Sequence, residues 1–232
     1  MRLVFRKPDK WRVFFRQLFV EANKLIIGSI PLIALISVFI GAVLVLQTAS
    51  NIENPFIPKM YVGYMTRESL MLEFCSTMVC LILAGKIGSN IASEIGSMRI
   101  TEQIDAMEMM GVNSANYLIF PKLISTTVLS PFLMVMSFIL GLIGGGLIVM
   151  LTGIININDY VDGLRFALNL YYLFYSIIKT AVFCFIISSV SCYFGYYAKD
   201  GSLGVGRSST RAIVASSALI LTFNLILTQI LL

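Results

Sequence analysis

The side chains of this chain that could do chemistry are few, and no recognisable catalytic set is among them. The 232 residues include no histidine, which excludes Ser-His-Asp and Cys-His triads and histidine metal sites. No G-x-x-x-x-G-K-[ST] motif occurs, so no P-loop ATPase is encoded here. The cysteines lie in apolar stretches without C-x-x-C spacing, which favours inert buried thiols over a disulfide or metal site. They are Cys75, Cys80, Cys184 and Cys192.

Three ionisable groups in apolar surroundings are the next candidates. Arg67 and Glu68 begin a long apolar run, and Glu73 follows one and a half turns later. A carboxylate inside a membrane is costly unless it is paired or wet, so Glu73 is a candidate for a functional site. Its simplest partner is Arg67 or the aqueous mouth of a cavity, and a pocket role and a structural pair both stay open. Lys179 lies in another apolar run, where snorkelling outward is favoured over substrate contact.

Composition predicts that all these groups belong to an integral membrane protein. Hydrophobic residues make up 58% of the chain and charged residues 12%, with a mean hydropathy of +0.89. A soluble fold of this size cannot hide that much apolar surface. The apolar runs predict an all-α protein with about five transmembrane helices. The predicted spans are 25–46, 67–96, 123–152, 170–197 and 210–232, with polar loops over 48–66 and 153–169.

The N-terminal residues 1–24 are basic and aromatic in alternation. Positions 11, 14, 15, 18 and 19 share one helical face, which predicts an amphipathic helix lying in the membrane interface rather than a solvated tail. We therefore expect two regions, this interfacial helix and a membrane domain over 25–232.

The distribution of Lys and Arg predicts the orientation. The N-terminal segment, the 86–122 connection and the 199–211 loop hold seven, three and three of the 17 basic residues. The other side holds four. The positive-inside rule then predicts a cytoplasmic N-terminus and an outward C-terminus, and it accounts for the net charge of +5 without nucleic acid.

The connection at 84–122 carries the densest pattern. Small residues recur every four positions from Ala84 to Gly96, which predicts a close helix contact. Residues 97–110 then predict one amphipathic helix, with Glu102, Asp105 and Glu108 on its acidic face. Gly111 is expected to end it, and Pro121 to open the next element. Such a helix is suited to docking in a partner's groove.

A second pattern, GSLGVGR at 201–207, invites comparison with phosphate-binding loops. Its glycines fall as G-x-x-G-x-G and no strand precedes it, so we expect a tight turn instead. Ser208 or Ser209 would then cap the last span.

Three blocks of sequence resemble the MlaE/YrbE permease family. They are SEIGSMRITEQIDAMEMMGV at 93–112, FGYYAKDGSLGVGRSSTRAIVASSALILTFNLILT at 194–228 and FIGAVLVLQ at 39–47, in matching order and spacing. The resemblance implies the permease subunit of an ABC transporter that moves phospholipids across the envelope from the cell inner membrane. It implies a second permease copy, an ABC ATPase that holds the ATP and Mg, and an outer MCE-domain substrate-binding protein. No cofactor or metal is expected in this chain.

The same resemblance assigns site residues to two regions. The family's coupling helix matches Gly96 to Met110, and the coupling residues by position are Glu94, Gly96, Arg99, Glu102, Gln103, Asp105 and Glu108. The lipid-pocket candidates are Leu44, Gln47, Arg67 and Glu68 by the resemblance, and Leu70 and Glu73 where the sequence departs from the family's pattern. Arg67 would lie near a lipid phosphate or pair with Glu68. The family often continues its Arg-Glu pair with Leu-Gly-Pro, which this chain lacks, so we expect a less kinked backbone there.

Three competing interpretations remain. A stand-alone secondary transporter or channel usually shows inverted repeats or charges at mid-membrane, and neither is evident. An intramembrane enzyme is disfavoured by the missing histidines. A scaffold that only recruits soluble partners would use the same cytoplasmic helix. The residues specify neither the direction of transport nor the lipid class, partner stoichiometry or envelope type.

Overall fold

A computed structural model describes residues 11–52, 56–199 and 201–231, and within these ranges it contains helices and connections but no strand. Five helical stretches are long and apolar enough to cross a membrane, which confirms the predicted all-α membrane fold. They are Phe14–Asn51, Met60–Ile100, Ser114–Thr152, Leu170–Tyr196 and Gly201–Leu231. The predicted interfacial segment up to residue 10, and Asn54 and Pro55 of the predicted loop, lie outside the described residues.

The first two spans are longer than the apolar runs that predicted them. Helix α1 (Trp11–Glu21) continues through a π-helical turn and a 3-10 turn into α2 (Ile30–Asn51). The second span joins α3 (Met60–Ser69), α4 (Val79–Leu83) and α5 (Ser89–Ile100). Its links are the π-helical stretches Leu70–Met78 and Ala84–Gly88. The backbone after Arg67 and Glu68 therefore stays helical, although it widens into π-helical turns.

The remaining helices correct several predicted loops. Helix α7 (Ser114–Thr152) begins before Pro121, so this proline does not open it. The predicted loop 153–169 contains α8 (Ile157–Arg165), and α9 (Leu170–Tyr196) follows. Helix α10 (Gly201–Leu231) includes the glycine-rich stretch, so the predicted turn at 201–207 is wrong.

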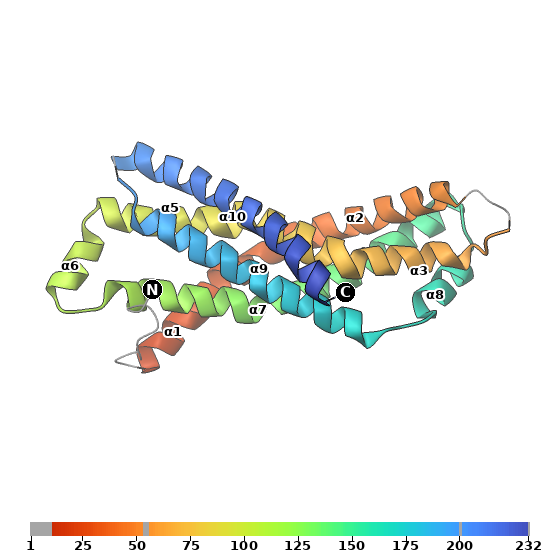
Figure 1. Ribbon diagram of the computed structural model, residues 1–232, viewed down its shortest axis with the longest axis horizontal. Helices are drawn as coiled ribbons and strands as arrows, with labels where there is room; N and C mark the ends of the chain where they lie inside the picture. Colours follow the sequence, from red (N-terminus) through yellow and green to blue (C-terminus); the bar gives the residue numbers. More distant parts are fainter. Residues whose placement is uncertain (1–10, 53–55, 200, 232) are drawn as a thin grey trace. The chain divides into compact units, whose positions relative to one another are not determined.

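The chain divides into two compact units, of which the first comprises residues 1–29, 80–131 and 181–232. Helices α5 and α10 lie side by side in it (Figure 1). A Cβ added to Gly96 would lie 3.2 Å from a methyl group of Val205, and one added to Gly195 would lie 2.8 Å from the carbonyl oxygen of Ala92. The small-residue ridge is thus a close helix contact, as predicted. Ser209 caps nothing; it lies within α10 and donates to the carbonyl of Ser89 at 3.3 Å.

The second unit comprises residues 30–79 and 132–180 and is held by even closer backbone approaches. A Cβ on Gly41 would lie 1.8 Å from the carbonyl oxygen of Gly141, and one on Gly144 would lie 2.2 Å from that of Val38. Glycine is therefore required where α2 crosses α7.

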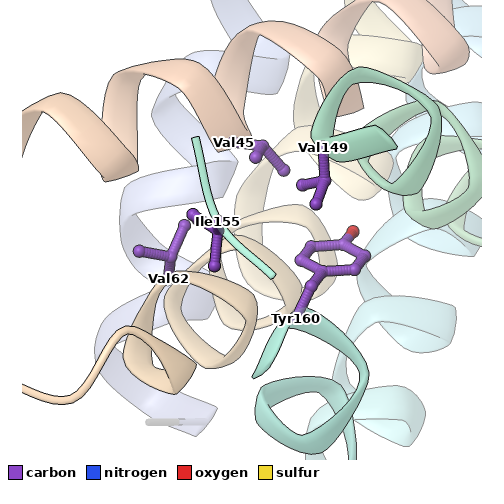
Figure 2. Packing of buried hydrophobic residues seen from close by; sticks show 5 residues of the cluster. All are labelled: Val45, Val62, Val149, Ile155 and Tyr160. Carbon is purple, nitrogen blue, oxygen red and sulfur yellow. The ribbon is translucent and has the colours of Figure 1, made fainter. Parts of the chain in front are cut away.

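Helix α8 closes one end of this unit through Tyr160. Its ring packs with Val45, Val62, Val149 and Ile155 in a buried cluster (Figure 2). The hydroxyl donates to the carbonyl of Leu142 at 3.1 Å, and burial raises the pKa of Tyr160 to about 12. The four cysteines are buried, as predicted, and none of them forms a disulfide.

The α2–α7 crossing can be tested with neighbouring glycines of one helix. Gly144→Ala should destabilise the protein by about 1–3 kcal/mol, because its Cβ would overlap the backbone of Val38. Gly146→Ala is the matched control, since its Cβ would make an ordinary 3.7 Å contact with Tyr160 and gain helix propensity of about 1 kcal/mol. When thermal unfolding is measured in detergent, only Gly144→Ala should show a lower Tm than the unmodified protein. Equal Tm values for both would contradict the close crossing.

Candidate functional site

The segment between the second and third spans folds as a separate short helix. Helix α5 ends at Ile100, and α6 (Gln103–Met109) begins after a turn in which Glu102 adopts φ +58° (Figure 1). The predicted single helix over 97–110 is therefore wrong. A left-handed residue breaks the helical path and costs of order 1 kcal/mol for a side chain other than glycine.

The end of α6 follows the prediction closely. Gly111 has φ +78° and donates to the carbonyl of Glu108 at 2.9 Å, while Val112 donates to that of Met107 at 3.0 Å. This pair of bonds is a Schellman cap, which requires a residue that tolerates the left-handed region.

The two acidic side chains within α6, Asp105 and Glu108, form bonds to neighbouring helices. Asp105 pairs with Arg99 of α5 at 2.6 Å. Glu108 accepts hydrogen bonds from Ser114 of α7 at 2.7 Å and from Tyr196 of α9 at 2.8 Å. The guanidinium of Arg99 also lies 5.7 Å from the ring centre of Tyr196. Asp105 and Glu108 thus fasten α6 to its neighbours while Glu108 stays exposed, and their coupling role stays a prediction.

Two exposed methionines form the surface that α6 offers instead. Met109 is 90% exposed and Met110 is 71% exposed, whereas Ile104 on the opposite side is fully buried. Glu102 and Gln103 are also exposed beside them. The sequence signal for this surface was the adjacent pair of methionines directly before the glycine stop, on a helix whose inner face is apolar. Methionine is adaptable and common at binding surfaces.

The two remaining coupling candidates lie deeper in α5. Gly96 is buried against Val205 and Ala198 of the first unit, so it packs rather than faces outward. Glu94 belongs to an ion cluster: it lies 2.8 Å from Lys122 and 2.9 Å from Lys24. Sequence reasoning missed Lys122, although it is the one charge in a long apolar run.

The predicted lipid-pocket residues lie in the second unit, where the Arg67 side chain is buried and bonded within the protein. Its side chain is 2% exposed and pairs with Glu68 at 2.5 Å. It also donates to the carbonyls of Leu164 and Phe166, each at 2.8 Å. Of the two predicted roles, pairing with Glu68 is the one the structure confirms, and the side chain fastens the chain after α8.

The structure pairs Lys179 with Glu73, and this pair corrects the prediction made for each residue. The Lys179 side chain is 0% exposed and its Nζ lies 2.8 Å from a carboxylate oxygen of Glu73, so it does not snorkel. The other Glu73 oxygen accepts from Thr77 at 3.0 Å. The Nζ also lies 4.9 Å from the ring centre of Tyr175. The partner of Glu73 is thus Lys179 rather than Arg67, while 43% of the glutamate side chain stays exposed.

The other pocket candidates divide by exposure. Leu44 and Leu70 are buried with Cys75 and Met134 in a second apolar cluster, which gives them a packing role. Gln47 is exposed. In the ranges that the structure covers, no group of three or more His, Cys, Asp or Glu side chains could hold a metal ion.

Removing one partner of the Glu73–Lys179 pair should have unequal effects. Glu73→Gln leaves a buried ammonium without its anion and should cost about 3–5 kcal/mol of stability. Lys179→Met leaves a carboxylate that is 43% exposed and should cost less. The double variant should recover most of the loss, as measured by unfolding in detergent. Additive losses in the double variant would show that the pair does not interact.

The bonds to Glu108 predict a pH dependence. Glu108 is an exposed carboxyl whose pKa is lowered by hydrogen bonds. The bond from Ser114 has the largest effect, and the bond from Tyr196 lowers the pKa further. A group whose pKa falls on folding stabilises above its unfolded pKa of about 4.3, and this contribution is lost as the pH drops through the folded value. The Tm loss caused by Tyr196→Phe should thus be full at pH 6 and shrink below about pH 4. A Tm loss that stays constant down to pH 3.5 would contradict the link.

Comparison with known proteins gives one consistent result. Residues 18–230 match the family described as Permease MlaE. A probable ABC transporter permease protein of Rickettsia bellii is 35% identical over 98% of this chain and 86% of its own length. A probable ABC transporter permease protein of Synechocystis sp. is 32% identical over 84% of this chain and 74% of its own length. Protein TRIGALACTOSYLDIACYLGLYCEROL 1, chloroplastic, of Arabidopsis thaliana is 30% identical over 89% of this chain and 57% of its own length. With five apolar helices and this match over nearly all its length, the chain belongs to the MlaE permease family.

Proposed function

We propose that this permease is the membrane subunit of an ABC transporter that moves phospholipids across the cell envelope. The ATP and Mg would be held by a separate ATPase subunit, and the permease would make and break no covalent bond. The family membership and the permease names of the relatives support this proposal. The Arabidopsis relative is named after trigalactosyldiacylglycerol, a glycolipid built on diacylglycerol, and this name is consistent with a lipid cargo.

The observation that carries the proposal is the way α6 is mounted. It presents Met109 and Met110 outward, while Asp105 and Glu108 fasten its other side to α5, α7 and α9. A conformational change in an ATPase bound to these methionines would therefore be transmitted to three helices that continue into the membrane. Two arrangements of the permease, biased by the nucleotide state of the partner, are sufficient for transport.

The proposed orientation places α6 in the cytoplasm of a cell with an inner membrane. The three segments on that side hold 13 of the 17 Lys and Arg residues, and the C-terminus lies outside. An MCE-domain protein would then meet the outer side.

The lipid pocket would form between two copies of the permease near the outer end of the spans. Gln47 and Glu73 are the exposed polar candidates among the predicted pocket residues. Leu44, Arg67 and Leu70 would support the wall from behind, because all three are buried. The cargo tails would contact the apolar wall, and its head would meet the two polar groups.

A stand-alone transporter or channel is the second candidate function. The Glu73–Lys179 pair favours it, because charges within a membrane often mark an ion or substrate path. An autonomous carrier, however, gives no reason for a projecting helix with two exposed methionines.

The docking surface on α6 can be tested directly. Met109→Asp combined with Met110→Asp should weaken ATPase binding at least about tenfold, because two charges would enter an apolar contact. Met109→Leu with Met110→Leu is the control and should keep the complex. Copurification of the ATPase and lipid transfer by the reconstituted complex are the measurements. An intact, active complex with the aspartate variant would refute docking at this surface.

A further inference from the structure

A cavity in the first unit has no place in the transport mechanism above. It has a volume of about 400 Å³ and lies between α1, α5 and the start of α7. This volume is within the range of small-ligand sites. We infer that this cavity binds the phosphate-ester headgroup of a membrane phospholipid, at a site distinct from the lipid pocket.

The cavity wall contains a completed ion cluster. The Lys122 side chain is 2% exposed and its Nζ lies 2.6 Å from Glu21 and 2.8 Å from Glu94. Lys24 pairs with Glu94 at 2.9 Å. Two ammonium groups thus face two carboxylates, so the cluster by itself is neutral and rigidly placed.

Arg16 adds the charge that makes the cavity attractive to an anion. It lines the cavity, is exposed, and forms no ion pair with any residue that the structure describes. Gln17 and Tyr117 line the same space and can donate further hydrogen bonds. Lys24 pairs with Glu94 from outside the lining, and with it three cations against two carboxylates leave a net charge of +1. A guanidinium with neighbouring donors is the preferred protein partner of a phosphate group.

Glu21 supplies an acceptor beside these donors. Its second carboxylate oxygen is buried and accepts no hydrogen bond from the described part of the chain. An unsatisfied buried oxygen is costly, so a donor on the ligand would stabilise it. A phospholipid headgroup offers this donor as an ammonium or hydroxyl next to the phosphate, whereas the cavity's Val20 and Leu118 suit the start of the apolar acyl chains.

The position along the helices indicates a lipid rather than a free ion. Met60–Ile100 has 41 residues and Ser114–Thr152 has 39, about twice the roughly 20 residues that cross the hydrocarbon core. Glu94 and Lys122 lie about 9 and 12 Å from the ends of these helices next to α6, which is the depth of lipid headgroups. Trp11, Phe15 and Phe19 are exposed on α1 in the same unit, as expected where a helix meets a bilayer.

Photocrosslinking with mapped sites tests this inference. The purified protein in nanodiscs would be exposed to phosphatidylglycerol with a photoactivatable group at its glycerol end, and labelled peptides identified by mass spectrometry. We expect labelling of α1 and the start of α7, reduced about tenfold by Arg16→Gln, since a charge-assisted bond is lost. Arg12→Gln is the control, because Arg12 is exposed on the same helix and does not line the cavity. A photoactivatable diacylglycerol without phosphate should label these peptides weakly.

The outcomes distinguish a phospholipid headgroup from free inorganic phosphate as the ligand of this cavity. Labelling that depends on Arg16 and on the lipid phosphate, and that persists in excess inorganic phosphate, supports the headgroup site. Complete displacement by millimolar inorganic phosphate would assign the cavity to the free anion and overturn the lipid source. Equal labelling in Arg16→Gln and Arg12→Gln would overturn the site itself. ATPase binding and transport are not needed for this readout, so its failure is distinct from failure of the proposed function.

Discussion

A cation buried in a membrane protein must be paired with an anion or with carbonyl oxygens, and this constraint organises both units of the permease. Arg67, Lys122 and Lys179 have side chains that are 2%, 2% and 0% exposed. Each one meets a carboxylate, because an unpaired charge at such a position would cost several kcal/mol. Lys122 joins α1, α5 and α7, Arg67 joins α3 to the chain after α8, and Lys179 joins the π-helical stretch to α9. The polar groups therefore fix which helices lie together, while apolar side chains fill the space between them.

The same constraint separates the two surfaces to which function is assigned. On α6 the two acids bond to neighbouring helices, and the exposed methionines at its end are the apolar surface left for a partner. In the second unit Arg67 is buried and paired with Glu68, so the partly exposed Glu73 rather than an arginine is the ionisable group that the proposed lipid pocket would use. The proposed mechanism follows from this division: the ATPase would grip methionines, and the ion pairs behind them would pass on the movement.

The fold was largely predictable from the sequence, because an apolar run of bilayer length has few alternatives. The helix contacts at the ridge ending in Gly96 and the cap at Gly111 were also predictable, since small residues and positive φ leave a direct signature. Helix ends were missed where polar residues continue a helix against a packed neighbour, as at Ser114 and Gly201. The partner of Glu73 was missed because Lys179 is distant in sequence, and spacing carries no information on such pairs. The bond from Tyr196 to Glu108 was missed for the same reason, since the two residues are 88 positions apart.

Native mass spectrometry of this permease, extracted gently from its own membrane, tests the central claim most directly. The account predicts a complex that contains two copies of the chain, an ABC ATPase and bound phospholipid, and it predicts that the ATPase dissociates when Met109 and Met110 are replaced by aspartate. A chain that is isolated alone under the same mild conditions, and that moves lipid or ions without ATP after reconstitution, would contradict it. In that case the Glu73–Lys179 pair would become the centre of a self-contained carrier.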